Sequence, residues 1–242
     1  MLTKAGGIHS SVSAGVALCC CLAFVAALPG AALSAEGVVP ITSEPVHKIR
    51  FDNGKVRVIE AAIAKGKASL FHTHLHDAFF VFFNAAEVGN QMFGEMPVFV
   101  KLQAGAAHFT STANGSYVHS VIATDESAVH VSALELMRQP TSEAATAPEE
   151  RFPPFEVVVD NPRGRLYRLK LNAGQSTEAF ARSAGTAVFA ISSGRISEKS
   201  EGKPDRLWDF DPGHFRWIEA GEELMIRNEG TAPVHLVEIE VF

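Results

Sequence analysis

Three histidines stand at alternate positions in one short stretch of the chain, His72, His74 and His76, and Asp77 follows them directly. If this stretch is a β-strand, residues i, i+2 and i+4 point to one face, so the three imidazoles lie side by side. Neutral imidazole is the commonest protein ligand for zinc, copper, iron and nickel. The spacing therefore indicates a candidate metal site.

A glycine stands a few residues before the first of these histidines, and another stands before a later histidine, His119. Gly66 stands six residues before His72, and Gly115 stands four residues before His119. The segment Gly66-x5-His72-x-His74 resembles the first half of the first cupin motif, and Gly115-x3-His119 resembles the histidine part of the second. Counting the internal repeat described below, this similarity to the cupin family covers nearly all of the chain after its first residues.

The resemblance implies a set of ligands. In cupin proteins two histidines of the first motif and one of the second converge on a divalent metal inside a β-barrel, and a glutamate of the first motif usually completes the set. By this resemblance His72, His74 and His119 are metal ligands, and His76 is a fourth candidate. Fe, Mn, Zn, Ni and Cu are all compatible ions, and no other cofactor is implied.

One position departs from the family pattern. The family glutamate should follow His74 by four or five residues, where this chain has Ala78 and Phe79. His76 and Asp77 are the nearest substitutes. Three imidazoles without a carboxylate can still hold a metal with open positions for water or substrate, as in carbonic anhydrase-type zinc sites.

The chain carries one unit twice. The segment Ser127–Met137 aligns with Ala232–Phe242 at a constant offset of 105 residues, with identical residues that include His130 and His235. An earlier stretch, Lys65–Phe83, aligns with Ala173–Ile191 at an offset of 108 residues. The two copies predict two homologous domains.

Both domains are predicted to be β-sheet, because short β-branched or aromatic segments alternate with turn dipeptides and no convincing helix is present. With the resemblance, this predicts an all-β chain of two tandem cupin barrels (jelly rolls, or double-stranded β-helices). We assign barrel 1 to residues 41–140, a linker to 141–152 and barrel 2 to 153–242. The predicted strands are Val56–Ile63, Phe79–Phe83, Pro97–Leu102, Tyr117–Ala123 and Val129–Met137 in barrel 1, and Phe155–Val159, Leu166–Leu171, Ala187–Ser192, Phe215–Ile218, Glu223–Arg227 and Val234–Phe242 in barrel 2.

The second copy lacks the histidines of the first. By the repeat, Phe180 corresponds to His72, Arg182 to His74 and Leu224 to His119. None of these side chains can replace imidazole as a metal ligand, so barrel 2 is predicted to be structural or to bind something without a metal. His130 and His235 occupy equivalent positions, and His235 is predicted to be a packed, hydrogen-bonded core residue.

Three functions stay open. The first is a metal-dependent cupin enzyme, an oxidoreductase such as a dioxygenase or an isomerase, that acts on a small molecule. The second is a binding module whose polar barrel mouth holds an organic ligand without a metal, and the third is a structural, oligomer-forming cupin. No catalytic residue can be named, because Asp77, Glu87 and Glu95 are acid–base candidates on position alone.

The first residues have the pattern of an export signal. Lys4 precedes an apolar run, Val16–Leu28, and small residues near Ser34 and Ala35 suit cleavage, so residues 1–35 are predicted to be a secretory signal peptide. A membrane anchor is the alternative, but the run is shorter than the roughly 20 residues that a span needs. We therefore expect an exported protein, periplasmic or extracellular, with no membrane span after cleavage.

Composition narrows the partners. All three cysteines lie inside the predicted signal, so the mature chain has neither disulfides nor thiol chemistry. The formal net charge is −6 and no run of Lys or Arg stands out, which excludes nucleic acid as an expected partner. The expected partners are a small-molecule ligand and, in a homo-oligomer, further copies of the chain.

Overall fold

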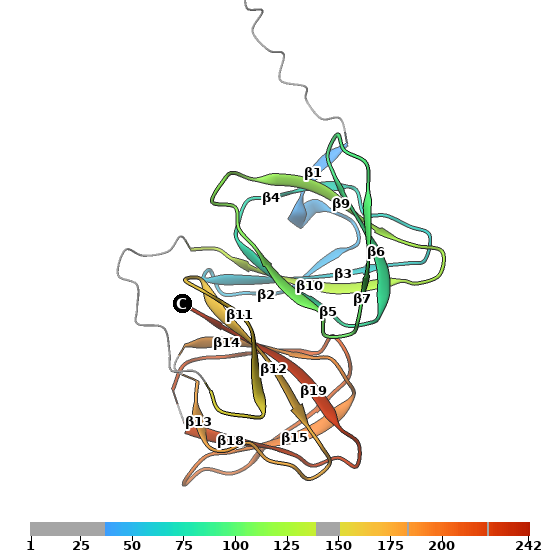
Figure 1. Ribbon diagram of the computed structural model, residues 1–242. Helices are drawn as coiled ribbons and strands as arrows, with labels where there is room; N and C mark the ends of the chain where they lie inside the picture. The colour runs from blue at the N-terminus through green and yellow to red at the C-terminus, as the bar shows by residue number, and fades with distance from the viewer. Residues whose placement is uncertain (1–36, 139–150, 183, 222) are drawn as a thin grey trace, which may run out of the picture. The chain divides into compact units, whose positions relative to one another are not determined.

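The described part of the chain consists of short β-strands joined by turns (Figure 1). The structure is a computed structural model, and it describes residues 37–138, 151–182, 184–221 and 223–242. Within these ranges the helical content is one 3-10 turn, η1 (Ile41–Ser43), and there is no α-helix. The predicted all-β class is confirmed. The predicted signal peptide and most of the predicted linker lie outside the described residues.

Barrel 1 is built from two five-stranded sheets. One has the strand order β1-β4-β9-β6-β7 and the other the order β2-β3-β10-β5-β8. Their bounds are β1 (Val38–Pro40), β2 (His47–Asp52), β3 (Val56–Ile63), β4 (Phe71–His74), β5 (Ala78–Phe82), β6 (Ala86–Met92), β7 (Val98–Leu102), β8 (Ala107–Thr110), β9 (Tyr117–Ala123) and β10 (Val129–Leu136). The strands are antiparallel except for β1, which runs parallel to β4.

Barrel 2 repeats this plan. Its sheets have the orders β11-β12-β19-β14-β17 and β13-β18-β15-β16. The bounds are β11 (Phe155–Asn161), β12 (Gly164–Leu171), β13 (Phe180–Ala181), β14 (Gly185–Ala190), β15 (Gly194–Lys199), β16 (Arg206–Phe210), β17 (Phe215–Ile218), β18 (Glu223–Asn228) and β19 (Val234–Val241). The first sheet matches β2-β3-β10-β5-β8 strand for strand, so the prediction of two tandem cupin barrels is confirmed.

Strand bounds were predicted best where the apolar signal is strong. The predictions for β3, β9 and β17 agree with the structure at both ends, and β10 and β19 each end one residue earlier than predicted. The strands β1, β2, β6, β8, β13, β15 and β16 were not predicted, since most are short and several carry polar residues on both faces. Strand β1 also begins before residue 41, the predicted start of barrel 1.

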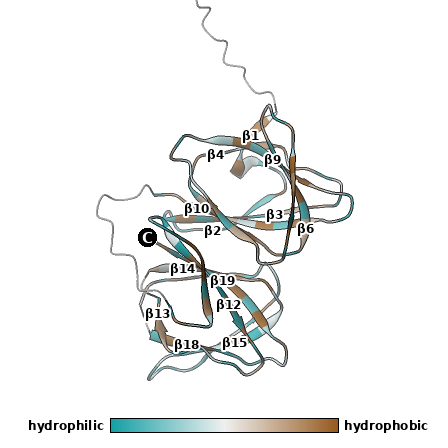
Figure 2. Cartoon of the chain, viewed as in Figure 1, coloured by the Kyte–Doolittle hydropathy of each residue, from teal (hydrophilic) through white to brown (hydrophobic). Residues whose placement is uncertain are grey.

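The largest apolar core lies between the two barrels and not inside either one. It joins residues of β3, β5 and β10 to residues of β12, β14 and β19, among them Phe79 and Leu134 from barrel 1 and Leu166 and Phe189 from barrel 2. Other buried residues of these strands form a separate apolar cluster inside each barrel. Because these central strands are buried on both faces, β5 and β14 are apolar along most of their length, whereas β10 and β19 also carry polar residues. Apolar residues, in brown, are visible along parts of β10 and β19 in Figure 2.

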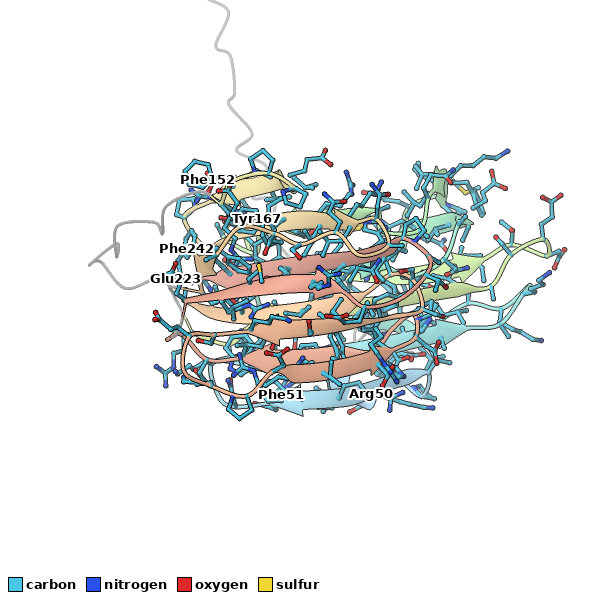
Figure 3. The ribbon with its side chains drawn as sticks, turned by 90° about the horizontal axis from the view of Figure 1, so that it is seen from below. Arg50, Phe51, Phe152, Tyr167, Glu223 and Phe242 are labelled. Carbon is cyan, nitrogen blue, oxygen red and sulfur yellow. The ribbon has the colours of Figure 1, made fainter. Side chains whose placement is uncertain are left out.

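The edge of this core is aromatic. Phe51 on β2 contacts Phe215 and Trp217 on β17, with ring centroids 5.5 and 5.8 Å apart. Figure 3 labels Phe51 beside Arg50 on β2, next to strands of barrel 2. The two barrels thus share one core within the compact unit formed by residues 36–242.

Two glycine–histidine contacts follow the internal repeat. A Cβ added to Gly105, in the turn before β8, would lie 2.4 Å from the ring of His235 on β19. Its repeat counterpart is Gly213, in the turn before β17, where an added Cβ would lie 2.6 Å from the ring of His130 on β10. Each barrel supplies one glycine and one histidine, so the contact has pseudo-twofold symmetry. His235 is packed as predicted, but its Nε2 has no hydrogen-bond partner among the described residues.

In the ranges that the structure describes, no helix is long and apolar enough to cross a bilayer. The predicted signal sequence, residues 1–35, is not covered by this observation.

Shortening a side chain in the shared core should destabilise the whole described unit. We expect Phe79→Ala to lower the free energy of unfolding by about 3–5 kcal/mol, because it removes a fully buried ring and leaves a cavity. Urea titration followed by tryptophan fluorescence measures this, since Trp217 lies at the same core. Phe152→Ala is the control, since that ring is 66% exposed. Equal losses in the two variants would contradict a core shared by both barrels.

Candidate metal centre

Three histidines of barrel 1 converge on one point of its interior. His72 and His74 lie on β4, and His119 lies on the neighbouring strand β9, directly opposite His72 in the antiparallel register. All three side chains are buried, and one ring nitrogen from each lies within 4.8 Å of the others. The closest pair is Nε2 of His74 and Nε2 of His119, 3.0 Å apart. The predicted convergence of these three residues is confirmed.

The glycine-containing stretch before β4 fixes its position against β9. The Gly66 amide donates to the carbonyl of Thr124, and the Ser69 amide donates to the carbonyl of Val121. The Ser120 hydroxyl on β9 in turn donates to the Ser69 carbonyl. These bonds continue the pairing of β4 with β9, so both histidines of β4 enter the barrel next to His119.

Two of the imidazoles have a fixed tautomer. Nδ1 of His72 lies 2.9 Å from the carbonyl oxygen of Leu70, and Nδ1 of His119 lies 2.6 Å from Oδ1 of Asn90. Both partners are acceptors, so each Nδ1 must carry the proton and donate. Each Nε2 is then unprotonated, and that of His119 lies 3.0 Å from Nε2 of His74 and can accept its proton in a hydrogen bond. A hydrogen-bonded Nδ1–H behind a free Nε2 is the usual arrangement of metal-binding histidines.

His74 is held differently. Its ring stacks on Tyr117 at 4.7 Å with an interplanar angle of 8°, and its buried Nδ1 has no hydrogen-bond partner among the described residues. The Tyr117 ring, from β9, therefore fixes the plane of this imidazole. The cluster fits a divalent ion of the nitrogen-binding type, because three neutral imidazole nitrogens face one shared point.

Burial keeps the cluster uncharged. Loss of hydration lowers the pKa of His72 to about 4, of His119 to about 3 and of His74 to about 2, and the proximity of the rings to one another adds to the effect for His74 and His119. At neutral pH all three imidazoles are neutral, which is the form that binds metals.

The N-terminal segment of barrel 1 covers the cluster. His47 on β2 makes an edge contact with His72 at 4.6 Å, and its Nδ1 donates to the carbonyl of Ile41 in η1. Buried Glu44 accepts the amides of Val46 and Leu70. Sequence reasoning missed His47 and Asn90, because no motif marks the strands that carry them, and it missed Tyr117, because the motif within which it lies marks only Gly115 and His119.

The carboxylates nearest to the motif do not join the cluster. Asp77 accepts hydrogen bonds from Thr112 and from Nε of Arg163 in barrel 2, so the idea that it replaces the family glutamate is wrong. These bonds lower the Asp77 pKa against the opposing effect of burial. His76 is only half-buried and lies outside the group of three ring nitrogens.

A buried carboxylate does lie beside the position of the family glutamate. Glu135 on β10 is directly opposite Ala78 on β5 in the sheet register and is fully buried. Its Oε2 pairs with Arg57 at 3.4 Å, while Oε1 has no partner among the described residues. Burial raises the Glu135 pKa. Glu135 and Arg57 are opposite each other on β10 and β3, and their counterparts in the internal repeat, Glu240 and Arg165, are opposite each other in barrel 2.

Barrel 2 has a different interior at the matching place. Phe180 on β13 is opposite Leu224 on β18, in the same register as His72 and His119. Arg182, at the position of His74, is buried and donates to Glu198 at 3.1 Å and to Glu238 at 3.0 Å. Within the described ranges, the histidine cluster of barrel 1 is the one group of metal-type ligands found.

A second arginine adds to these ion pairs. Arg151, also buried, donates to Glu238 and Glu240 and lies over the rings of Tyr167 and Phe180. Pairing with the two arginines lowers the Glu238 pKa although its burial acts in the opposite direction. Ion pairs and aromatic rings therefore occupy this part of the barrel 2 interior.

Comparison with solved structures shows the fold. AerE from Microcystis aeruginosa is 13% identical, with a TM-score of 0.57 over 82% of this chain and 98% of that one. A cupin 2 conserved barrel domain protein from Leptotrichia buccalis is 12% identical, with a TM-score of 0.50 over 81% and 88%. Oxalate decarboxylase from Bacillus subtilis, which has Mn(II) centres, is 11% identical, with a TM-score of 0.50 over 77% and 69%.

At these identities the likeness shows the fold alone, and the fold is that of cupin proteins. No protein-family model matches the sequence. No curated protein matches it either. What the histidine cluster does must therefore be argued from its own geometry.

Acid should destabilise the metal-free protein through the histidine cluster. Above about pH 6.5 the imidazoles are neutral in both the folded and the unfolded chain, so they add no pH dependence. Below it, the unfolded chain takes up protons that the folded chain excludes, and stability falls by roughly 1.4 kcal/mol per pH unit for each such histidine until its folded pKa is reached.

Urea titrations between pH 8 and pH 4.5 on protein treated with a chelator measure this slope. His74→Gln should have a shallower slope than the wild type, by about one proton, because the variant lacks the histidine with the lowest folded pKa. Parallel curves for the two proteins would contradict a neutral, buried His74.

Breaking the ion pairs inside barrel 2 should be costly. We expect Arg182→Met to lower the free energy of unfolding by about 3–5 kcal/mol, because it leaves Glu198 and Glu238 buried with fewer partners. Arg195→Met is the matched control, since the pair between Arg195 and Asp209 is on the surface, and its Tm should barely change. A Tm for Arg182→Met equal to that of the control would show that these pairs are dispensable.

Proposed function

We propose that barrel 1 binds one divalent metal ion through His72, His74 and His119, and that the protein is an exported, metal-dependent cupin enzyme acting on a small molecule. The observation that carries the proposal is the tautomer arrangement at the cluster. Leu70 and Asn90 hold the Nδ1–H groups of His72 and His119, which leaves the Nε2 of each unprotonated, and a ring nitrogen from each of the three histidines lies within 4.8 Å of the others. Manganese is one candidate ion, because a structural neighbour has Mn(II) centres.

When bound, such an ion would supply Lewis-acid or dioxygen-binding chemistry of the kind that oxidoreductases and isomerases use. The protein's own residues would orient and protect the centre. Asn90 fixes the ring of His119, Tyr117 fixes the plane of His74, and His47 covers His72. With three neutral ligands and no carboxylate in the cluster, the full charge of the ion stays available to a bound group.

In the second candidate function, barrel 1 is a non-catalytic small-molecule-binding or structural cupin with a degenerate metal site. Asp77, Glu87 and Glu95 were the acid–base candidates, and none of them is among the described residues that line the cavity in front of the histidines. This absence favours a binding role over acid–base catalysis. We propose in either case that barrel 2 is structural, because Phe180, Arg182 and Leu224 occupy its corresponding place.

Export and assembly complete the proposal. The apolar run Val16–Leu28 with its small-residue cleavage region supports a signal peptide over residues 1–35, and hence a periplasmic or extracellular protein without a membrane span. We also propose that the protein forms a homo-oligomer. It is not expected to bind nucleic acid, because its net charge is negative.

Metal analysis of the untagged protein tests the centre. We expect close to one equivalent of divalent metal per chain by plasma mass spectrometry, and near-complete loss in His72→Ala and in His119→Ala. Asn90→Ala should weaken binding by about 10–100-fold, because it frees the ring of His119 without removing a ligand. Titration calorimetry of chelator-treated protein with Mn²⁺ or Zn²⁺ gives these affinities.

His214→Ala is the control, since His214 is an exposed residue of barrel 2 and should leave the metal content unchanged. A His72→Ala protein with wild-type metal content would refute the site. Protein that takes up no metal but shows a ligand-dependent rise in Tm would support the binding module instead.

A further inference from the structure

The three histidines open onto a large cavity inside barrel 1. Its volume is about 570 Å³, within the range of pockets that enclose small organic molecules. The cavity lies between the two sheets of the barrel, and its walls determine which molecules can leave water and enter it. The chemistry of these walls is therefore evidence about the ligand.

The wall opposite the histidines is almost entirely apolar. Strands β3, β5 and β10 present six side chains to the cavity, namely Ile59, Ala61, Phe80, Phe82, Val131 and Ala133. These residues belong to the sheet whose other face packs against barrel 2. None of them can donate or accept a hydrogen bond through its side chain, so this wall can contact only the apolar surface of a ligand.

The polar groups of the lining are concentrated at one end. His72, His74 and His119 face the cavity together with their neighbours His47 and Asn90. A second polar group lies on β8, where Thr110 bonds with Tyr117 and the ring of His108 stacks on Phe80 at 5.0 Å. A bound molecule would therefore find its metal-coordinating partners at the histidine end.

The lining carries no fixed charge. Among the described residues that form the cavity wall there is no lysine, arginine, aspartate or glutamate. A dicarboxylate, phosphate or ammonium ligand would lose its hydration without gaining an ion pair with any of these side chains. Burial of apolar surface, in contrast, is favourable along most of the wall.

We propose that this cavity binds a mainly apolar small molecule whose polar end faces the histidine cluster. The role of the polar end rests on the proposed function, since a metal at the cluster would hold it. The apolar part stands on the lining alone. The ligand proposed for this protein differs from oxalate, the small dianion that appears in the name of the oxalate decarboxylase neighbour.

Strand β7 provides a place to test the cavity without disturbing the core. It is the edge strand of its sheet, and Val98, Val100 and Leu102 on one of its faces line the cavity. Phe99, on the opposite face, does not. Val100 and Phe99 are each 46% exposed, so either position should accept a charged side chain without unfolding the barrel.

The probe is N-phenyl-1-naphthylamine, a neutral aromatic amine whose fluorescence rises in apolar surroundings. We expect saturable binding of one molecule per chain in metal-free protein. Val100→Glu should weaken it at least tenfold, because the variant places a carboxylate at the cavity wall, while Phe99→Glu should retain wild-type binding. Circular dichroism and Tm establish that both variants are folded.

Displacement of this probe tests the orientation. In metal-loaded protein 1-naphthol should displace it at a lower concentration than naphthalene, because only the naphthol has an oxygen for the histidine end. His119→Ala should abolish this preference, and Phe99→Glu should keep it. Equal displacement by the two compounds in wild-type protein would overturn the predicted orientation.

The results separate this inference from the proposed function. Saturable probe binding in a protein that takes up no metal would support the apolar cavity and refute the metal centre. Metal uptake without saturable probe binding, or oxalate binding tighter than the probe, would overturn the inference and leave the metal centre standing. Equal probe affinity in wild-type protein and Val100→Glu would also overturn it.

Discussion

Burial of one sheet on both faces is the constraint on which the described structure depends. The sheet β2-β3-β10-β5-β8 packs one face against barrel 2 and turns the other toward the cavity. Alternate residues of β5 illustrate the division, since Phe79 joins the shared core and Phe80 lines the cavity. Because this sheet is fixed from behind, and a smaller apolar cluster joins it to the other sheet of barrel 1, the barrel can keep a cavity in its interior.

The histidine cluster benefits from lying on the other sheet. Strands β4 and β9 belong to the other sheet of barrel 1, on the far side of the cavity from the shared core, so substitutions there can change ligands without removing the main apolar contacts. The same fold therefore holds neutral imidazoles in barrel 1 and an ion pair of Arg182 with Glu238 in barrel 2. The arginine side chains of barrel 2 are donors without a lone pair, whereas neutral imidazoles have a nitrogen lone pair that a metal can bind.

The repeat also accounts for how the barrels meet. Gly105 faces His235 and Gly213 faces His130, so duplicated residues occupy equivalent positions on the two sides of the contact. The pairing of Asp77 with Arg163 is an addition outside this symmetry. It ties the residue that follows the histidine motif to barrel 2, which is why a carboxylate close in sequence to the ligands is not available to them.

Local patterns in the sequence were enough to predict the β-class, the duplication and the shared face of His72 and His74, because strand periodicity and motif spacing are local properties. The convergence of His119 with these two residues came from the resemblance to the cupin motifs, not from periodicity. The sequence by itself could not determine that Asp77 turns away, that Asn90 and Tyr117 orient the rings, or that Glu135 lies opposite Ala78. Those relations join strands far apart in the chain. Only the register and packing of the folded sheets decide them, since a shift of one residue reverses the face to which every side chain of a strand points.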